Sequence, residues 1–277
     1  MRKIWTPILL RVAYPVAFIM LLVFIAWWGH VLISRIQTPT TIADIAYDNI
    51  RRARNTDYRI FIEENGVLVP YLVLTTNYSR SSNVLLLREY LLDERKPINP
   101  SPHGVERLWG WQDFGAYYPD SHMDNFLNTE FKTRLGNATI AAMVPSDVVV
   151  TDKDSIGVGG LTSRIITRYV FLLSVRELGV PDSSINVPEG QVLRYFRGDF
   201  TKRVATLSDG RPIPYWTRSP STWETCLVFT VGVDSGGIGT ADVYSGVRPA
   251  FALSRTTPIT THTNSITDET FFVLCWE

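Results

Sequence analysis

The fold that we expect for this chain is decided near its C-terminus by residues 215–220, Tyr-Trp-Thr-Arg-Ser-Pro, and residues 245–253, Ser-Gly-Val-Arg-Pro-Ala-Phe-Ala-Leu. Between them, residues 225–233 are rich in β-branched and aromatic side chains, which predicts a largely buried strand. Residues 234–239, Asp-Ser-Gly-Gly-Ile-Gly, predict a chain reversal, because glycine adopts positive φ without a Cβ clash. Pro249 has no N–H to donate, so the strand around it is expected at a sheet edge or as an irregular strand.

Upstream, local signals predict short strands, few helices and long loops. Asn65-Gly66 suits a type I′ hairpin turn, whose two central residues both need positive φ. Ser121 is a helix N-cap before apolar side chains that recur with helical spacing as far as Leu135. Residues 93–119 contain four prolines and little periodicity, which predicts a long ordered loop. Together these patterns predict an α+β domain.

Four motifs that occur in one order resemble a bacterial and phage family that is catalogued as domain-of-unknown-function family six-two-seven-three. They are residues 118–121 leading into 125–128, residues 170–174 with Glu177, Glu189-Gly190, and the two C-terminal stretches quoted above. The resemblance covers roughly residues 58–277. The C-terminal half of this family is in turn similar to C-type-lectin and formylglycine-enzyme-like folds. The resemblance therefore implies a C-type-lectin-like mixed α+β domain, and fold analogy alone implies no function.

The N-terminal segment predicts a membrane anchor. Residues Val12 to Ile33 contain no Asp, Glu, Lys or Arg, and a helix of about 22 residues spans roughly 33 Å, which matches a hydrocarbon core of about 30 Å. Trp5 precedes the span and Trp27-Trp28 lie near its far end, where interfacial aromatic residues are expected. We interpret the segment as an uncleaved single-pass anchor in the lipid bilayer. A buried core helix and a cleaved signal peptide are the alternatives.

Positive charge before the span sets the predicted orientation. Arg2, Lys3 and Arg11 precede it, so the positive-inside rule favours an N-terminus inside the cytoplasm and a C-terminal domain outside it. We therefore divide the chain into a transmembrane anchor at residues 1–36, a helical stalk at 37–57 and the lectin-like domain at 58–277.

Composition and motifs exclude several classes of function. The formal net charge is zero, so no global field attracts nucleic acid. The chain has no phosphate-binding loop, and residues 157–160, Gly-Val-Gly-Gly, are too short for a dinucleotide fingerprint, so no cofactor is expected. The histidines lack the spacing of zinc ligands, and no metal is expected. Residues 233–237, Val-Asp-Ser-Gly-Gly, look like the nucleophile motif of chymotrypsin-like proteases, but the histidine context that this chemistry needs is missing.

The chain has two cysteines, Cys226 and Cys275, and both fall in predicted strands. In an exported domain, a structural disulfide between them is our first interpretation. Closing a loop of about 50 residues would stabilise the fold by roughly 4 kcal/mol in the chain-entropy model. Two free buried thiols are the alternative that the sequence leaves open.

Aromatic side chains supply the candidate ligand-binding surface. Aromatic rings with polar neighbours can stack on a sugar ring or contact a protein partner. The candidate ligand-binding residues are Trp109, Trp111, Tyr117, Tyr118, Trp216 and Arg218. Trp223 lies near the same motif. The alternative is that these aromatic residues form the core beneath the long loops.

The sequence therefore favours a membrane-anchored, surface-displayed binding domain that recognises a glycan or a protein and catalyses no reaction. The first alternative is a structural component of a cell envelope or virion. The second is a glycan-processing enzyme, whose two carboxylates can come from any part of a chain. The sequence leaves open the identity of the ligand and the oligomeric state.

Overall fold

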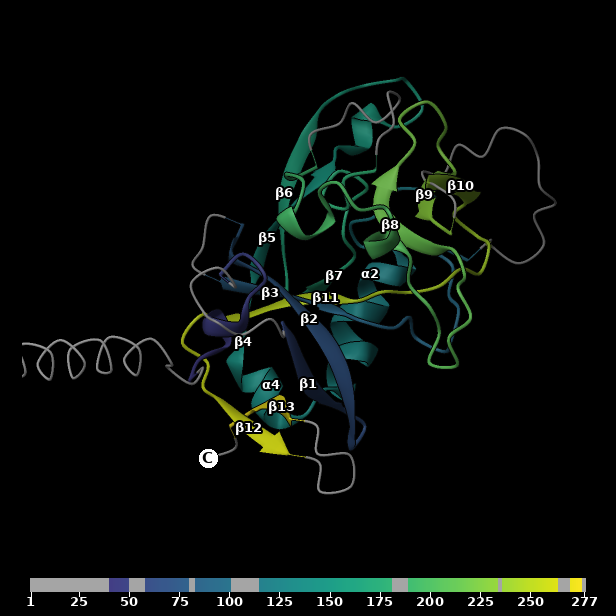
Figure 1. Ribbon diagram of the computed structural model, residues 1–277. Coiled ribbons are helices and arrows are strands. Elements are labelled where there is room, and N and C mark those ends of the chain that lie inside the picture. Colours follow the sequence, from purple (N-terminus) through teal and green to yellow (C-terminus); the bar gives the residue numbers. More distant parts are fainter. Residues whose placement is uncertain are drawn as a thin grey trace, which may run out of the picture. The chain divides into compact units, whose positions relative to one another are not determined.

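The computed structural model describes one compact unit, Pro39–Glu277, at residues 40–49, 58–79, 83–100, 115–180, 189–233, 236–263 and 270–275. Strands predominate in these ranges, where thirteen strands are found and α-helix is confined to the stretch between residues 122 and 142 (Figure 1). The expected α+β, C-type-lectin-like class is therefore wrong, and the domain is predominantly β. Strands depend on partners that are distant in sequence, so a local pattern underestimates them.

No helix in the described ranges is long and apolar enough to span a bilayer. The transmembrane helix that we expected at Val12 to Ile33 lies outside the described residues and is not part of the described fold. The anchor and its orientation stay predictions from the sequence.

The segment before the first strand differs from the regular helix that we expected at residues 37–57. Its described part contains a single 3-10 turn, η1 (Ile42–Ile45), and the backbone is already extended at Ala46. The backbone N–H of Ile42 donates to the carbonyl of Thr257 at 2.9 Å, and Ile42 and Ile45 are fully buried. Packing against the strand domain thus takes the place of further helical turns.

The largest sheet has eight strands. They are β1 (Arg59–Glu64), β2 (Val67–Tyr78), β3 (Asn83–Arg88), β4 (Met143–Val144), β7 (Val170–Phe171), β11 (Ala250–Ser254), β12 (Ile259–Thr263) and β13 (Thr270–Leu274). Their order is β12-β13-β1-β2-β3-β11-β4, and β7 also pairs with β11. β1 and β13 are parallel, and the other pairs are antiparallel.

The hairpin between β1 and β2 confirms the predicted turn. Asn65 has φ 49° and Gly66 has φ 81°, as the two central positions of a type I′ turn require. Glu64 is paired directly with Val67 across the turn. The two-residue connection therefore fixes the register of the hairpin.

The strand after Pro249 is central rather than at an edge, which corrects our expectation. β11 pairs with β3 on one side and with β4 and β7 on the other. Pro249 immediately precedes the strand, so its missing N–H removes no ladder hydrogen bond. Its carbonyl accepts from the backbone N–H of Arg88 at 3.0 Å.

Two smaller sheets carry the C-terminal motif and its neighbours. One contains β5 (Ser146–Thr151) and β6 (Ser163–Arg168), and the other contains β8 (Tyr215–Pro220), β9 (Leu227–Val231) and β10 (Gly236–Thr240). The reversal that we expected over residues 234–239 is wrong in its last four residues, because β10 already begins at Gly236. A Cβ at Gly239 would lie 2.9 Å from Cη2 of Trp216. Glycine in the strand therefore allows the indole to pack against it.

The predicted helix after Ser121 is confirmed. The side chain of Ser121 accepts a hydrogen bond from the backbone N–H of Asp124 at 3.1 Å. The helix consists of α2 (His122–Phe126), a π-helical segment η2 (Leu127–Phe131) and α3 (Lys132–Arg134), and α4 (Asn137–Ala142) follows it. The remaining 3-10 turns are η3 (Lys153–Ser155), η4 (Arg194–Phe196) and η5 (Thr201–Arg203).

Candidate functional site

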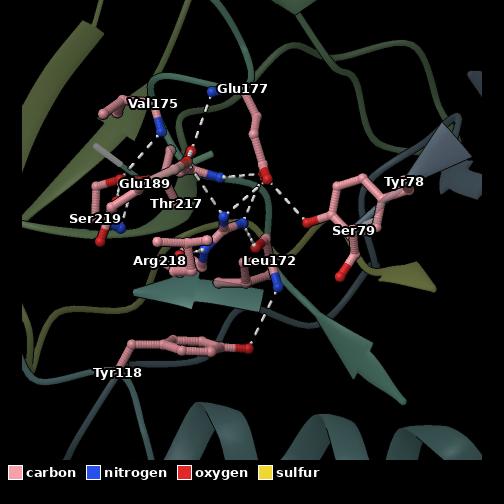
Figure 2. A network of polar contacts seen from close by, with 12 residues as sticks. Tyr78, Ser79, Tyr118, Leu172, Val175, Glu177, Glu189, Thr217, Arg218 and Ser219 are labelled. Carbon is pink, nitrogen blue, oxygen red and sulfur yellow. Dashed lines mark hydrogen bonds and ion pairs between the residues drawn. The ribbon is translucent and has the colours of Figure 1, made fainter. Parts of the chain in front are cut away.

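Three of the four sequence motifs meet in a buried ionic network, the Arg218 network, which contains Tyr78, Glu177, Glu189, Arg218 and Ser219 (Figure 2). Its centre is an ion pair between Arg218 in β8 and Glu177. Nη1 of Arg218 lies 2.6 Å from Oε2 of Glu177, and Nη2 lies 2.8 Å from Oε1. The two side chains are 0% and 3% exposed. The pair is therefore bidentate and fully withdrawn from water.

Every N–H group of the Arg218 guanidinium has an acceptor. Besides the two bonds to Glu177, Nε donates to the carbonyl of Val149 at 2.9 Å and Nη1 to that of Leu172 at 2.8 Å. Nη2 donates to the carbonyl of Glu189 at 3.4 Å. A guanidinium has five N–H donors, and these five bonds satisfy all of them. Arg218 thus joins β8 to β5, to the residue after β7, and to the segment at residue 189.

A capping box holds Glu177 in place. The backbone N–H of Glu177 donates to Oγ of Ser174, and the backbone N–H of Ser174 donates to Oε2 of Glu177, both at 3.0 Å. Tyr78 donates its hydroxyl hydrogen to Oε1 of Glu177 at 2.8 Å. Hydrogen bonds from its own turn, from β2 and from β8 therefore hold the carboxylate in place without a ligand.

Gly190 leaves the space that the Glu177 carboxylate occupies. A Cβ at position 190 would lie 2.7 Å from Oε1 of Glu177. Gly190 also has φ 89°, a backbone conformation that other residues adopt only with strain. The backbone conformation and the space taken by Glu177 therefore both explain why the second residue of the Glu189-Gly190 motif is glycine.

Glu189 connects the ends of two strands. Its Oε1 accepts from the backbone N–H and the hydroxyl of Thr151, at 2.8 and 2.7 Å. Its Oε2 accepts from the hydroxyl of Ser219. Thr151 ends β5 and Ser219 is the last residue but one of β8. The carboxylate thus fixes the points from which residues 152–162 and residues 221–226 depart.

Burial governs the electrostatics of the network. Loss of hydration raises the pKa of the Glu189 carboxyl above its ordinary value, and the Arg218 guanidinium opposes that rise. The hydroxyl of Ser219 accepts from the backbone N–H of Val175 at 3.1 Å and donates to Glu189. Since its groups are buried and bonded to one another, the network is suited to holding loops in place rather than to contacting a substrate.

The two loops that leave the network carry an exposed tryptophan. Trp223 is 68% exposed. The six-membered part of its indole lies against Gly159, where a Cβ would come within 2.5 Å of Cζ3 and Cη2. The backbone N–H of Gly159 donates to the carbonyl of Thr222 at 2.8 Å. The loop of residues 152–162 therefore packs against one side of the indole, and much of the remaining surface of the indole is exposed to solvent.

Three of the candidate ligand-binding residues belong to the core, which corrects our expectation. Tyr118, Trp216 and Arg218 are each at most 1% exposed. The Nε1 hydrogen of Trp216 is donated to the carbonyl of Lys96 at 2.9 Å, and the hydroxyl of Tyr118 accepts from the backbone N–H of Leu172 at 3.3 Å. All six residues of β8 are buried, so both faces of this strand belong to the interior of the domain.

The other candidates divide between the surface and the undescribed part of the chain. Tyr117 is partly buried, and its hydroxyl accepts from Nη1 of Arg164 at 3.3 Å. Trp109 and Trp111 lie outside the described residues. Trp223, which sequence reasoning noted but left out of the candidate set, is exposed to solvent, as is Tyr244 at 66%.

The two cysteines are free in the structure and only partly buried. The structure contains no disulfide between them, which differs from our first interpretation, and the free thiols are less buried than the second interpretation expected. Burial raises the pKa of the Cys226 thiol, and the charge of Glu224 adds to the rise. The described residues contain no group of three or more His, Cys, Asp or Glu side chains placed to hold a metal ion.

Sequence reasoning singled out Glu177, Glu189 and Arg218 within separate motifs but did not predict that they contact one another. The usable signal was the Ser174–Glu177 capping box, which fixes one carboxylate. A second signal was an arginine in a run of strand-forming residues, because a buried arginine needs an anionic partner.

The comparisons with known proteins support the family that the sequence resembles. The model of the family described as "Domain of unknown function (DUF6273)" matches residues 81–255. No curated protein and no solved structure matches the chain, so the resemblance to lectin-like folds gains no support. The matched range is more than half of the chain and contains Glu177, Glu189 and Arg218. The chain therefore belongs to the domain-of-unknown-function family DUF6273.

Proposed function

We propose that this domain is a binding module that recognises a glycan through a surface centred on Trp223. The observation that carries the proposal is an indole that is open to solvent yet supported by the backbone of a neighbouring loop. An aromatic face held in one orientation binds the C–H face of a pyranose ring without first having to become ordered.

Polar groups in the same two loops can bind the hydroxyl groups of a sugar. Lys153 and Asp154 are exposed in one loop, and Glu224 is exposed next to Trp223 in the other. Sugar recognition requires hydrogen-bonding groups around a stacking face, and these loops supply donors and acceptors of both charges. The Arg218 network supports the proposal because Glu189 fixes the starting points of both loops.

A glycan array probed with the full-length chain tests the proposal. We expect binding to a limited set of glycans, a loss of at least about tenfold in the Trp223→Ala variant, and unchanged binding in Phe200→Ala. Phe200 is a matched control because it is an aromatic residue of similar exposure, 62%, outside both loops. Absence of any glycan binding by the folded wild-type chain, or equal binding by Trp223→Ala, would overturn the proposal.

A protein ligand is the second candidate, and two aliphatic side chains favour it. Val158 and Leu161 lie on either side of the Gly159-Gly160 pair and are 70% and 56% exposed. An exposed tryptophan with aliphatic neighbours is also typical of protein-binding hot spots. Whole-cell binding separates the two candidates: periodate treatment of the cells should abolish binding to a glycan, whereas protease treatment should abolish binding to a protein.

A further inference from the structure

Three tyrosines from separate segments pack edge to face. None of them belongs to residues 152–162 or 221–226, the two loops around Trp223. Tyr47 follows η1, Tyr58 precedes β1, and Tyr195 lies in η4. Their ring centroids are 5.3 Å apart for Tyr47 and Tyr58, 5.1 Å for Tyr47 and Tyr195, and 5.5 Å for Tyr58 and Tyr195. The planes are inclined by 89°, 83° and 68°. The rings therefore hold one another in fixed orientations, which we call the tyrosine triad.

The ammonium group of Lys202 lies beside two rings of the triad. Its Nζ lies 4.9 Å from the centroid of Tyr47 and 4.9 Å from that of Tyr195. It also donates a hydrogen bond to the hydroxyl of Tyr47 at 3.2 Å. None of the ion pairs among the described residues involves Lys202. A cation thus lies next to two rings of the triad, toward the hydroxyl end of Tyr47, where the hydroxyl oxygen and the rings both attract it.

A primary ammonium is not the cation that suits this site best. It has three N–H donors, and the triad accepts one of them. A quaternary ammonium has no N–H to satisfy and spreads its charge over methyl groups, so it loses less hydration when it contacts aromatic faces. The last two carbons and the nitrogen of a lysine side chain also match the ethyl-ammonium part of choline in length. Displacing the lysine side chain would therefore free the position beside the two rings for the ethyl-ammonium part of such a ligand.

The neighbouring charges fit a choline ester as well. Arg194 is exposed and adjacent to Tyr195, and its Nη1 donates to the carbonyl of Asp48, the residue after Tyr47, at 3.2 Å. The guanidinium therefore lies beside the triad with donors left for a phosphate group. Lys202 belongs to the short surface turn η5, so its flexible stem can move into solvent and regain rotamer freedom when a ligand takes its place.

We propose that Tyr47, Tyr58 and Tyr195 form a binding site for the quaternary ammonium group of a choline-type ligand, and that Lys202 is an internal occupant which the ligand displaces. Tyr47 and Tyr195 contact the cation, and Tyr58 holds both rings in position. This inference is independent of the glycan proposal, since it concerns other residues and another ligand class.

The experiment titrates tetramethylammonium, choline and phosphocholine into the full-length chain and follows binding by calorimetry and by saturation-transfer NMR of the N-methyl signal. The wild-type chain should bind choline weakly and saturably. Lys202→Ala should bind about tenfold more tightly because it removes the internal competitor, and Tyr47→Leu should not bind. Tighter binding of phosphocholine than of choline, lost in Arg194→Gln, identifies a phosphate ester as the ligand form.

Lys132→Ala is the matched control. The Nζ of Lys132 lies 3.7 Å from the centroid of Tyr169, so this variant removes a lysine that contacts a single aromatic ring outside the triad. It should bind choline as the wild type does. Binding by neither wild type nor Lys202→Ala, or binding by Lys202→Ala alone, would overturn the proposal, because the triad would then serve only to hold Lys202. If Tyr47→Leu fails to fold, Tyr47→Phe replaces it and should retain binding, because the ring remains.

Discussion

Replacing Arg218 by methionine should destabilise the domain by about 3–5 kcal/mol, because it leaves Glu177 as a buried carboxylate without its cation. Methionine has a similar unbranched shape and donates no hydrogen bond. The wild-type pair is bidentate at 2.6 and 2.8 Å and 0% and 3% exposed, so water cannot replace the lost charge. Three backbone carbonyls lose a donor as well.

A double variant separates the charge from the packing. Glu177→Gln combined with Arg218→Met removes both charges. The amide oxygen of glutamine can still accept from the backbone N–H of Ser174, and its NH2 group can donate to the hydroxyl of Tyr78. Replacing both partners of a buried ion pair is often nearly neutral, whereas breaking it by removing one is not. We therefore expect the double variant to be about 2–3 kcal/mol more stable than Arg218→Met alone.

Urea unfolding at pH 7, followed by tryptophan fluorescence and far-UV circular dichroism, measures these differences. Arg211→Met is the control, because it breaks the exposed ion pair with Asp209 and should leave the midpoint unchanged. If Arg218→Met does not fold, recovery of folding in the double variant decides the question. The reasoning is refuted if Arg218→Met lies within about 1 kcal/mol of the wild type, or if the double variant loses the sum of the two single effects.

Three further predictions follow from the same contacts. The pKa of Glu189 is raised in the folded state. The stability that its protonated form contributes is therefore complete below the ordinary pKa and is lost as the pH rises through the raised value. Urea midpoints over pH 4–8 should fall with pH in the wild type relative to Glu189→Gln, and parallel curves would contradict this. Gly190→Ala should cost about 2–3 kcal/mol, because its Cβ would meet Glu177 at 2.7 Å. Gly210→Ala, with φ 84° and nothing within 4 Å of its Cβ, should cost only the backbone strain of about 1 kcal/mol, and equal losses in the two variants would argue against the steric account. Thiol labelling of the unfolded, unreduced chain should count two free thiols at Cys226 and Cys275, whereas unlabelled cysteines would restore the disulfide.

Features that depend on a few neighbouring residues could be predicted from the sequence. The Asn65-Gly66 turn needs two residues that tolerate positive φ, and the pair occurs between two strand-like stretches. Ser121 caps its helix through the N–H of a residue three positions later. The Ser174–Glu177 capping box likewise joins residues that are three positions apart in the sequence. In each case the residues that decide the structure are close together in the chain.

Features that depend on distant residues could not be predicted in this way. β11 is central because β3, β4 and β7 pair with it, and no local pattern around Pro249 reveals those partners. Arg218 looked like a surface residue because arginine is seldom buried unless it is paired. Its partner Glu177 lies 41 positions away in the sequence. The predominance of strands escaped prediction for the same reason as the position of β11.

The arrangement of the Arg218 network separates the residues that hold the domain together from those that can determine a ligand. Glu189 contacts Thr151 and Ser219 at the ends of β5 and β8, and none of these three side chains is exposed. Residues 152–162 and 221–226 begin at these fixed points, and their exposed side chains can change without loss of any contact in the network. A fold built in this way can therefore keep one scaffold and present different loops. We expect an alignment of the family to retain Glu177, Glu189 and Arg218 together while both loops vary. Loops that are invariant around a variable network would contradict this division of roles.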